Sequence, residues 1–382
     1  MSRCPSGRIY IKNNMAKEKK KVFVALSGGV DSSVALYLLK KQGYDVTAVF
    51  IKIGESIEMP EKSGDKLFID SCWIGERRDA MRVAAFLDVP FLTFDFEKEY
   101  NREVLDYFFR EYKAGRTPNP DVMCNRKIKF PLFWKKARAL GADFMATGHY
   151  ARKRDVKCQM SNVKCPQLLA GKDKEKDQSY FLYNLKSRNL EHILFPIGDL
   201  KKAEVRKIAK EAGLPTALKR ESQGLCFLGH VNIQEFLKTR IKPKKGEIIT
   251  VDGKIIGEHD GLAYYTIGQR RGIGVKGGGS AYFVVDKNFK KNELIVAPLK
   301  DETRYYKKEL ELYDLNWVNG EPKLPLNCYA RIRYRAELEK CSVIKMQKNI
   351  IVKFSKPLRA VTPGQSVVFY DGDRILGGGV IK

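Results

Sequence analysis

A strand, a glycine-rich loop and a helix that follow one another near the N-terminus constrain the fold of this chain most. Residues 22–26 form a short apolar run that predicts a buried strand, and residues 32–41 have the periodicity of a helix with one apolar face. The loop between them is Ser27-Gly28-Gly29-Val30-Asp31-Ser32-Ser33. Two glycines let its backbone approach a phosphate, which the free amides and the dipole of the helix then face. The alternative is an ordinary Gly-Gly turn with an Asp or Ser helix cap.

Alternating strand and helix patterns continue beyond this unit. Further strands are expected at 46–53, 91–96 and 144–151, and helices at 77–87, 100–112 and 130–140. Such alternation produces right-handed parallel crossovers in a sheet that is covered on both faces. We therefore predict an α/β fold with a doubly wound parallel sheet, whose ligands lie at the carboxyl ends of the strands.

The character of the sequence changes after an amphipathic helix expected at 201–212. Short strands with glycine punctuation are expected at 246–256, 264–274 and 281–285, and further strands at 328–334, 341–346, 350–354 and 366–370. These patterns predict a small central β-rich domain and a C-terminal β-barrel. The expected division is a basic tail at 1–20, a catalytic domain at 21–230, a central domain at 231–296 and the barrel at 297–382.

The charge of the chain points to a polyanionic partner. The 382 residues include 71 lysines and arginines against 45 aspartates and glutamates, which gives a net charge of +26. Compact folding does not require this charge, whereas binding of a nucleic acid would favour it. A solvated lysine-rich surface is the alternative, because the basic residues are spread along the chain.

Neither a membrane span nor a disulfide scaffold fits the composition. No apolar run approaches the roughly 18 residues that a spanning helix needs. Eight cysteines in a chain of this length, without a signal-peptide pattern, favour a reducing compartment. We expect a cytoplasmic monomer with no membrane association. The N-terminal residues resemble a transit peptide only faintly and are interpreted as a disordered basic tail.

The glycine-rich loop differs from two common nucleotide-binding loops. It lacks the Gly-Lys-Ser/Thr ending of a Walker loop and the Gly-x-Gly-x-x-Gly spacing of dinucleotide sites. It resembles the pyrophosphate loop of ATP pyrophosphatases, which adenylate a carbonyl oxygen and expel pyrophosphate. This resemblance implies that ATP binds at the loop and that Asp31 helps to hold Mg²⁺.

Two cysteines in separate segments complete the pattern. Cys124 ends the run Asn119-Pro120-Asp121-Val122-Met123-Cys124, and Cys226 lies in Ser222-Gln223-Gly224-Leu225-Cys226-Phe227. Four more motifs are Ala146-Thr147-Gly148-His149-Tyr150, Lys176-Asp177-Gln178-Ser179-Tyr180, Gly268-Gln269-Arg270-Arg271-Gly272 and Thr362-Pro363-Gly364-Gln365. Together with the loop, these motifs resemble in order and spacing the tRNA-specific 2-thiouridylase family, from about Val22 to the C-terminus.

The resemblance implies an adenine nucleotide alpha hydrolase-like catalytic domain and a sulfur-transfer reaction. The implied substrate is the wobble uridine of the tRNAs for lysine, glutamate and glutamine. Its carbon-2 oxygen is adenylated with ATP and then replaced by sulfur, which yields 2-thiouridine, AMP and pyrophosphate. By this resemblance Cys226 carries the sulfur as a persulfide, and Cys124 either releases hydrosulfide from it or resolves it after transfer. Both routes leave a Cys124–Cys226 disulfide for an external reductant. The implied sulfur donor is a persulfide relay protein or a cysteine desulfurase.

The same resemblance assigns roles to individual residues. Asp121 is expected to act as a general acid or base, although a lone carboxylate after a proline also suits an Asx-turn. The residues expected at ATP are Ala25, Leu26, Ser27, Gly28, Gly29, Val30, Asp31, Ser32, Ser33, Ile51 and Gly148; at the target base, Asn119, Pro120 and Asp121; and at tRNA, His149, Lys176, Asp177, Gln178, Arg333, Tyr334 and Gln365. Arg331, Arg333 and Arg335 alternate along an expected strand, which predicts either a phosphate track on one face or an ordinary solvated face.

Two other functions use part of this pattern. Another tRNA-acting ATP pyrophosphatase, such as an amidotransferase-type synthetase or a lysidine-forming ligase, needs the loop but not two thiols. A noncatalytic tRNA-binding or sulfur-relay protein would bind tRNA without releasing pyrophosphate. Cys158, Cys165 and His149 match no zinc spacing, so no protein metal site is expected beyond Asp31.

Overall fold

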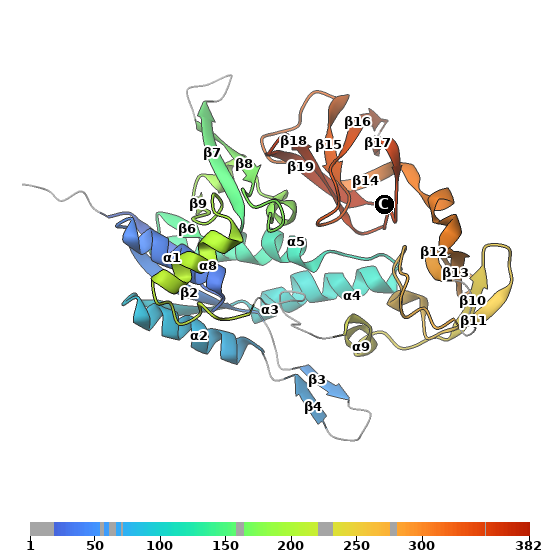
Figure 1. Cartoon of the computed structure of the whole chain (residues 1–382), viewed down its shortest axis with the longest axis horizontal. Helices are drawn as coiled ribbons and strands as arrows, with labels where there is room; N and C mark the ends of the chain where they lie inside the picture. Colours follow the sequence, from blue (N-terminus) through green and yellow to red (C-terminus); the bar gives the residue numbers. More distant parts are fainter. Residues whose placement is uncertain are drawn as a thin grey trace, which may run out of the picture.

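The α/β part of the chain, a small central sheet and a C-terminal barrel occupy separate regions of the molecule (Figure 1). The computed structural model describes residues 19–53, 57–60, 66–69, 72–157, 164–220, 232–275, 281–347 and 349–382. Over these residues, no helix is both long enough and apolar enough to cross a membrane.

The α/β part is built on a five-stranded parallel sheet, as expected from the sequence. Its strand order is β5-β2-β1-β6-β9. The bounds are β1 Lys21–Ala25, β2 Asp45–Lys52, β5 Phe91–Asp95, β6 Phe144–Ala146 and β9 Ile193–Leu194. The chain runs outward from β1 in one direction and from β6 in the other, so the order reverses between these two strands. Loops that leave the carboxyl ends of β1 and β6 therefore diverge and open a crevice there.

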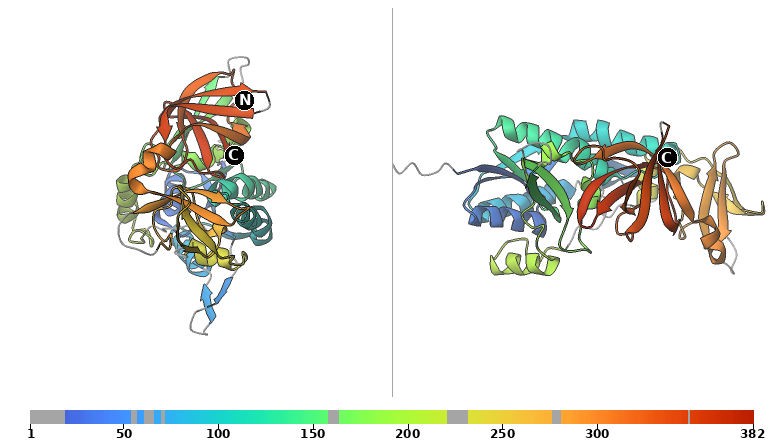
Figure 2. Two further views of the ribbon diagram at one scale, coloured as in Figure 1. Left: turned by 90° about the vertical axis from the view of Figure 1, so that its right-hand side faces the viewer. Right: turned by 90° about the horizontal axis from the view of Figure 1, so that it is seen from above.

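Helices cover both faces of this sheet (Figure 2). One face packs against α1 Val30–Lys41, α2 Cys72–Phe86 and α8 Lys202–Glu211, and the other against α4 Asp106–Lys113 and α6 Pro131–Ala139. Successive residues of β1 alternate between the two cores, with Val22 and Val24 in the first and Phe23 in the second. This alternation is the period of two that a strand imposes on its side chains.

Two expected elements of the α/β part differ from those observed. The helix expected at 100–112 is a continuous helical segment of three parts: α3 Glu97–Tyr100, a π-helical stretch Asn101–Leu105 and α4. The strand expected at 144–151 ends at Ala146, because the chain turns away from the sheet at residues 147–150. It then forms the hairpin of β7 Ala151–Lys157 and β8 Lys164–Ala170.

This hairpin extends the sheet of the C-terminal barrel, which the sequence did not indicate. Leu169 of β8 pairs with Arg374 of β19, and the Ala170 amide donates to the Asp373 carbonyl over 2.7 Å. Tyr180, a few residues later, donates its hydroxyl to the Ser366 carbonyl over 2.8 Å. The barrel is thus attached directly to the segment that follows the nucleotide crevice.

The barrel has six strands and is closed by pairing of its first strand with its last. The strand order is β14-β17-β16-β15-β18-β19, with β14 also paired to β19. The bounds are β14 Lys307–Trp317, β15 Leu326–Arg331, β16 Glu339–Met346, β17 Asn349–Leu358, β18 Ser366–Asp371 and β19 Arg374–Ile381. The expected C-terminal barrel is therefore confirmed, although the sequence patterns missed β14 and β19.

The central part contains α9 Ile233–Lys238 and a four-stranded sheet of order β11-β10-β13-β12. The strands are β10 Gly246–Thr250, β11 Ile255–His259, β12 Tyr282–Asn288 and β13 Glu293–Pro298. The strand expected at 264–274 is wrong: a 3₁₀ turn at Leu262–Tyr264 leads into irregular chain. Three glycines in this stretch have positive φ angles, which a strand does not accommodate. A short separate hairpin is formed by β3 Ile57–Pro60 and β4 Lys66–Ile69.

Candidate active site

The glycine-rich loop joins β1 to α1 at the crevice, as the sequence predicts. Gly28 has φ +74°, and a Cβ there would lie 2.3 Å from the Glu76 carbonyl oxygen, so only glycine fits between the loop and α2. The hydroxyls of Ser32 and Ser33 donate to the Gly29 carbonyl over 3.2 and 2.8 Å. Because amides in the first turn of a helix have no acceptor four residues earlier, those of α1 face out of the loop and can receive a phosphate.

Gly148 lies directly against this loop. A Cβ on Gly148 would lie 2.8 Å from the Ser32 amide nitrogen and 2.9 Å from its Cα. The two segments come from the neighbouring strands β6 and β1, where the strand order reverses. Ile51 lies near the carboxyl end of β2 on the other side of β1 and is partly buried. The predicted ATP residues thus lie at the carboxyl ends of three neighbouring strands.

Asp31 is held by a lysine that the sequence did not single out. Its Oδ1 accepts hydrogen bonds from the Tyr150 hydroxyl over 2.8 Å and from Lys202 Nζ over 2.6 Å. The Lys202 side chain is only 12% exposed and comes from the first turn of α8, the expected amphipathic helix. The pattern marked the helix, but no sequence signal marked this particular lysine.

The chain that leads toward Cys226 is also attached to the loop. Thr216 donates its hydroxyl to Ser33 Oγ over 3.0 Å. Lys219 Nζ donates to the Gly28 carbonyl over 3.1 Å and to Asp79 Oδ2 over 2.6 Å. Cys226 itself lies outside the described residues.

The Asn119-Pro120-Asp121 motif begins a short helix, α5 Pro120–Cys124. Asn119 caps it by accepting from the Val122 amide over 3.2 Å, and Pro120 occupies its first turn. The cap is therefore made by Asn119, whereas the sequence suggested Asp121 for an Asx-turn. Cys124 is 1% exposed, which is the environment of a packing residue rather than of a reactive thiol.

The turn at residues 147–150 connects the loop with the end of the helical segment that begins with α5. Its Gly148 packs on Ser32, and the ring of the next residue, His149, lies 5.8 Å from the ring of Phe130, six residues after Cys124. His149 Nδ1 is 2.8 Å from Thr147 Oγ1. Burial, with a smaller contribution from Lys129, lowers the pKa of His149 to about 3. His149 is therefore a neutral contact between the two halves of the candidate site at physiological pH.

Several residues expected at tRNA make hydrogen bonds inside the protein. Asp177 is 4% exposed, and its Oδ1 accepts from the Gly171 and Ser179 amides, each over 3.0 Å. Gln178 Oε1 accepts from the Tyr150 amide over 3.0 Å, and Gln365 Nε2 donates to the Thr117 carbonyl over 2.9 Å. These three side chains shape the backbone around the site.

The remaining residues expected at tRNA are accessible to different degrees. Arg333 is exposed, Lys176 is partly exposed, and the ring of Tyr334 lies 4.5 Å from that of Phe181. The expected row of three guanidinium groups is wrong. Strand β15 ends at Arg331, and Arg335 has φ +62°, which breaks the alternation. Arg331 also packs over the Tyr370 ring.

Three family profiles match successive parts of the chain. Family profiles described as "tRNA methyl transferase HUP domain", "tRNA methyl transferase PRC-barrel domain" and "Aminomethyltransferase beta-barrel domain" match residues 20–230, 234–298 and 307–381. The "tRNA-specific 2-thiouridylase MnmA" of Shouchella clausii is 45% identical over 367 residues, which are 96% of this chain and 97% of that protein. The protein of the same name from Geobacillus thermodenitrificans is 46% identical over 373 residues, 96% of each chain. The chain belongs to the tRNA-specific 2-thiouridylase family.

The side chains at the loop suit a magnesium ion that is held mainly by phosphate. Among the described residues, no group of three or more His, Cys, Asp or Glu side chains could hold a metal by itself. Asp31 supplies one carboxylate, about one-third exposed, whose two described donors both bind Oδ1. Mg²⁺ commonly binds through one or two carboxylates together with substrate phosphates, so this arrangement fits it.

We expect Gly148→Ala to weaken ATP binding. The added methyl group would meet backbone atoms of α1, which cannot rotate away, so the first turn of α1 must shift. Overpacking of this kind costs about 1–3 kcal/mol. Calorimetric titration with ATP measures the effect, and thermal unfolding reports the strain. Gly75→Ala is the matched control, because nothing lies within 4 Å of a Cβ there. Equal ATP affinity of the two variants would contradict the proposed contact.

We expect His149→Gln to reduce the loss of stability on acidification. The pKa of His149 is about 3 in the folded chain, against an ordinary value of 6.5. Between these values the unfolded chain binds a proton that the folded chain does not, so His149 makes stability fall as the pH falls. The slope from this one group is at most about 1.4 kcal/mol per pH unit. Urea unfolding at pH 7 and pH 5 should show a smaller difference for the variant, and identical differences would refute the lowered pKa of His149.

Proposed function

We propose that this protein is a tRNA 2-thiouridylase that uses ATP and a cysteine persulfide to convert the wobble uridine to 2-thiouridine. The turn at residues 147–150 carries this proposal, because it contacts both the nucleotide loop and the helical segment that includes Cys124. Membership of the 2-thiouridylase family supports the substrate. The tRNAs for lysine, glutamate and glutamine are the proposed substrates.

The first half of the reaction activates the base. The amides in the first turn of α1 would hold the phosphates of ATP, and Asp31 would help to hold a Mg²⁺ ion that offsets their negative charge. The carbon-2 oxygen of uridine is adenylated and pyrophosphate leaves. Asn119, Pro120 and Asp121 lie against the base, where Asp121 acts as general acid or base. A wobble base in a single-stranded loop costs only a few kcal/mol to extrude.

The second half replaces the activated oxygen with sulfur. In one route the Cys124 thiolate attacks the inner sulfur of the Cys226 persulfide, and the released hydrosulfide attacks carbon 2. In the other route the outer persulfide sulfur attacks carbon 2 first, and Cys124 then attacks the S–S bond to Cys226. AMP leaves in both routes, and both end with a Cys124–Cys226 disulfide, which an external dithiol reduces. A persulfide relay protein or a cysteine desulfurase reloads Cys226.

The burial of Cys124 requires a rearrangement during this cycle. A thiol that is 1% exposed is closed to the external dithiol that must reduce the disulfide. Because α5 is short and is followed by a π-helical stretch, Asn125–Lys129, its register is open to adjustment. We propose that binding of tRNA displaces α5 enough to expose the thiol.

We further propose that the protein is a cytoplasmic monomer with three domains, at 21–230, 231–296 and 297–382.

We expect Cys124→Ser and Cys226→Ser each to abolish thiolation and to leave tRNA binding intact, because a hydroxyl cannot carry or release sulfane sulfur. Purified protein, ATP, Mg²⁺, a sulfide source and tRNA supply the assay, and retardation of the tRNA in a mercury-containing gel detects the product. Cys4→Ser, in the N-terminal tail, is the control and should thiolate normally. Thiolation by either active-site variant would refute the mechanism. Pyrophosphate release without thiolation by the wild type would favour another tRNA-acting ATP pyrophosphatase.

We expect tRNA affinity to fall steeply with salt. Each phosphate that a lysine or arginine neutralises contributes about 0.7–0.9 to the slope of log affinity against log salt concentration. Filter binding between 50 and 300 mM KCl, about the range in which this effect is large, measures the slope. A slope near zero would contradict binding through the basic surface.

A further inference from the structure

The backbone that leads into α5 lies where all three parts of the protein meet. This segment, Gly115-Arg116-Thr117-Pro118, connects α4 with the Asn119 cap of α5 and is called the strap below. It has no regular secondary structure that would fix its position. Its position therefore depends on contacts with the rest of the chain.

The central domain holds the strap through a partly buried lysine. Lys287 Nζ of β12 donates to the Gly115 carbonyl over 3.0 Å, and Thr266 Oγ1 lies 3.2 Å from Thr117 Oγ1. Gly115 has φ +80°, and a Cβ there would lie 2.3 Å from the Phe289 ring, so the strap lies in close contact with this domain. Burial lowers the pKa of Lys287 to about 8, which reflects a lysine removed from solvent.

The barrel holds the next residue of the strap by its backbone. The Thr117 amide donates to the Pro363 carbonyl over 2.8 Å, and the Thr117 carbonyl accepts from Gln365 Nε2 over 2.9 Å. A Cβ on Gly364 would lie 2.9 Å from the Thr117 nitrogen. The barrel therefore pairs with both the backbone amide and the backbone carbonyl of Thr117.

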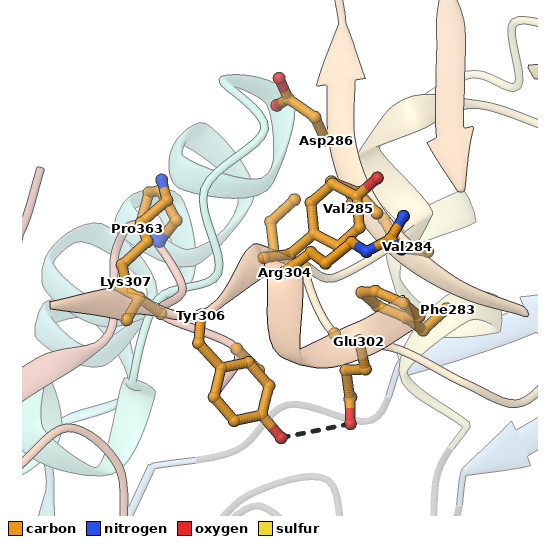
Figure 3. A pocket seen from close by; sticks show the side chains of 14 residues that line it. Phe283, Val284, Val285, Asp286, Glu302, Arg304, Tyr306, Lys307 and Pro363 are labelled. Carbon is orange, nitrogen blue, oxygen red and sulfur yellow. Dashed lines mark hydrogen bonds between the residues drawn. The ribbon is translucent and has the colours of Figure 1, made fainter. Parts of the chain in front are cut away.

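A cavity of about 350 Å³ is lined by residues of both domains (Figure 3). Val284, Val285 and Asp286 of β12 line it from the central domain, and Pro363 lines it from the barrel. The two domains also touch directly at this cavity, since Thr362 donates its hydroxyl to the Ile267 carbonyl over 3.4 Å and a Cβ on Gly268 would lie 2.4 Å from the Ala360 Cβ. Both domains in addition hold the strap, from which α5 begins two residues later.

We propose that Lys287 and Gln365 are positioning residues that set the place of α5, and with it Asp121 and Cys124, through the strap. This inference rests on the proposed thiolation reaction for its kinetic consequence. A direct tRNA contact by Gln365 predicts that its loss weakens tRNA binding. A positioning role predicts instead that its loss slows turnover with tRNA bound.

The test compares Lys287→Met and Gln365→Leu with the wild type in kcat for thiolation and in tRNA affinity. We expect kcat to fall about tenfold in each variant, since small displacements of reacting groups have effects of this order or larger. We expect tRNA affinity to change less than about twofold relative to Lys290→Met, which removes the same charge from an exposed position nearby. Because both residues act on one strap, the double variant should lose less than the product of the two single losses.

A second measurement does not depend on thiolation. Alkylation of Cys124 by iodoacetamide, read from its peptide by mass spectrometry without tRNA or ATP, should speed up severalfold in both variants as α5 loosens. Thermal unfolding identifies a variant that has merely unfolded. Unchanged alkylation and unchanged kcat in both variants would overturn the inference, as would a loss confined to tRNA affinity. A wild type that does not thiolate tRNA refutes the proposed function, while the alkylation rates still decide the role of the strap.

Discussion

The close approach of Gly148 to the first turn of α1 is the contact on which the rest of the site depends. A backbone without a side chain lies where a Cβ would be 2.8 Å from the Ser32 amide nitrogen. This contact places the carboxyl ends of β1 and β6 next to each other and aligns the amides of α1 with the crevice. The ring of His149 then lies 5.8 Å from the Phe130 ring, and Tyr150 donates its hydroxyl to Asp31. One short turn therefore fixes the phosphate loop, its acidic residue and the helical segment of Cys124 relative to one another.

The parts of this arrangement that follow local rules could be predicted from the sequence. Strand β1, the glycine-rich loop and α1 are encoded within 21 residues, and the parallel sheet follows from the alternation after them. Strands β14 and β19 were missed, the second because of its glycines. Strand β19 contains Gly377-Gly378-Gly379, which a pattern of apolar alternation does not reveal. Its glycines are required by neighbours far away in sequence, since a Cβ on Gly378 would lie 2.7 Å from the Tyr183 ring. The addition of β7 and β8 to the barrel likewise depends on a pairing between residues some 200 positions apart, for which the sequence has no local signal.

The candidate site shows the same limit at the level of single side chains. Motif resemblance located the loop, Gly148 and Asn119, and the structure places the first two together. It did not distinguish side chains that face solvent from those that complete the internal hydrogen bonding. Asp177, Gln178 and Gln365 bind backbone groups of residues 171, 150 and 117, where an unpaired polar group would cost about 1–3 kcal/mol. Lys202 was missed for the converse reason, because a lysine on an amphipathic helix is ordinary until the fold brings it to Asp31.

The distribution of positive charge follows from these internal roles. Near the site, Lys202 binds Asp31, Lys219 binds Asp79 and the Gly28 carbonyl, and Lys287 binds the Gly115 carbonyl. Lys202 is 12% exposed and the other two lysines are partly buried, so mobile ions screen their contacts less than those of fully exposed groups. Exposed groups such as Lys172, Lys174 and Arg333 are screened fully and are the ones available to attract a phosphate backbone. The positive charge thus includes an inner set that holds the loop and the strap and an outer set that faces solvent. Salt should therefore act on the association of tRNA more than on the geometry in which the base and the sulfur meet.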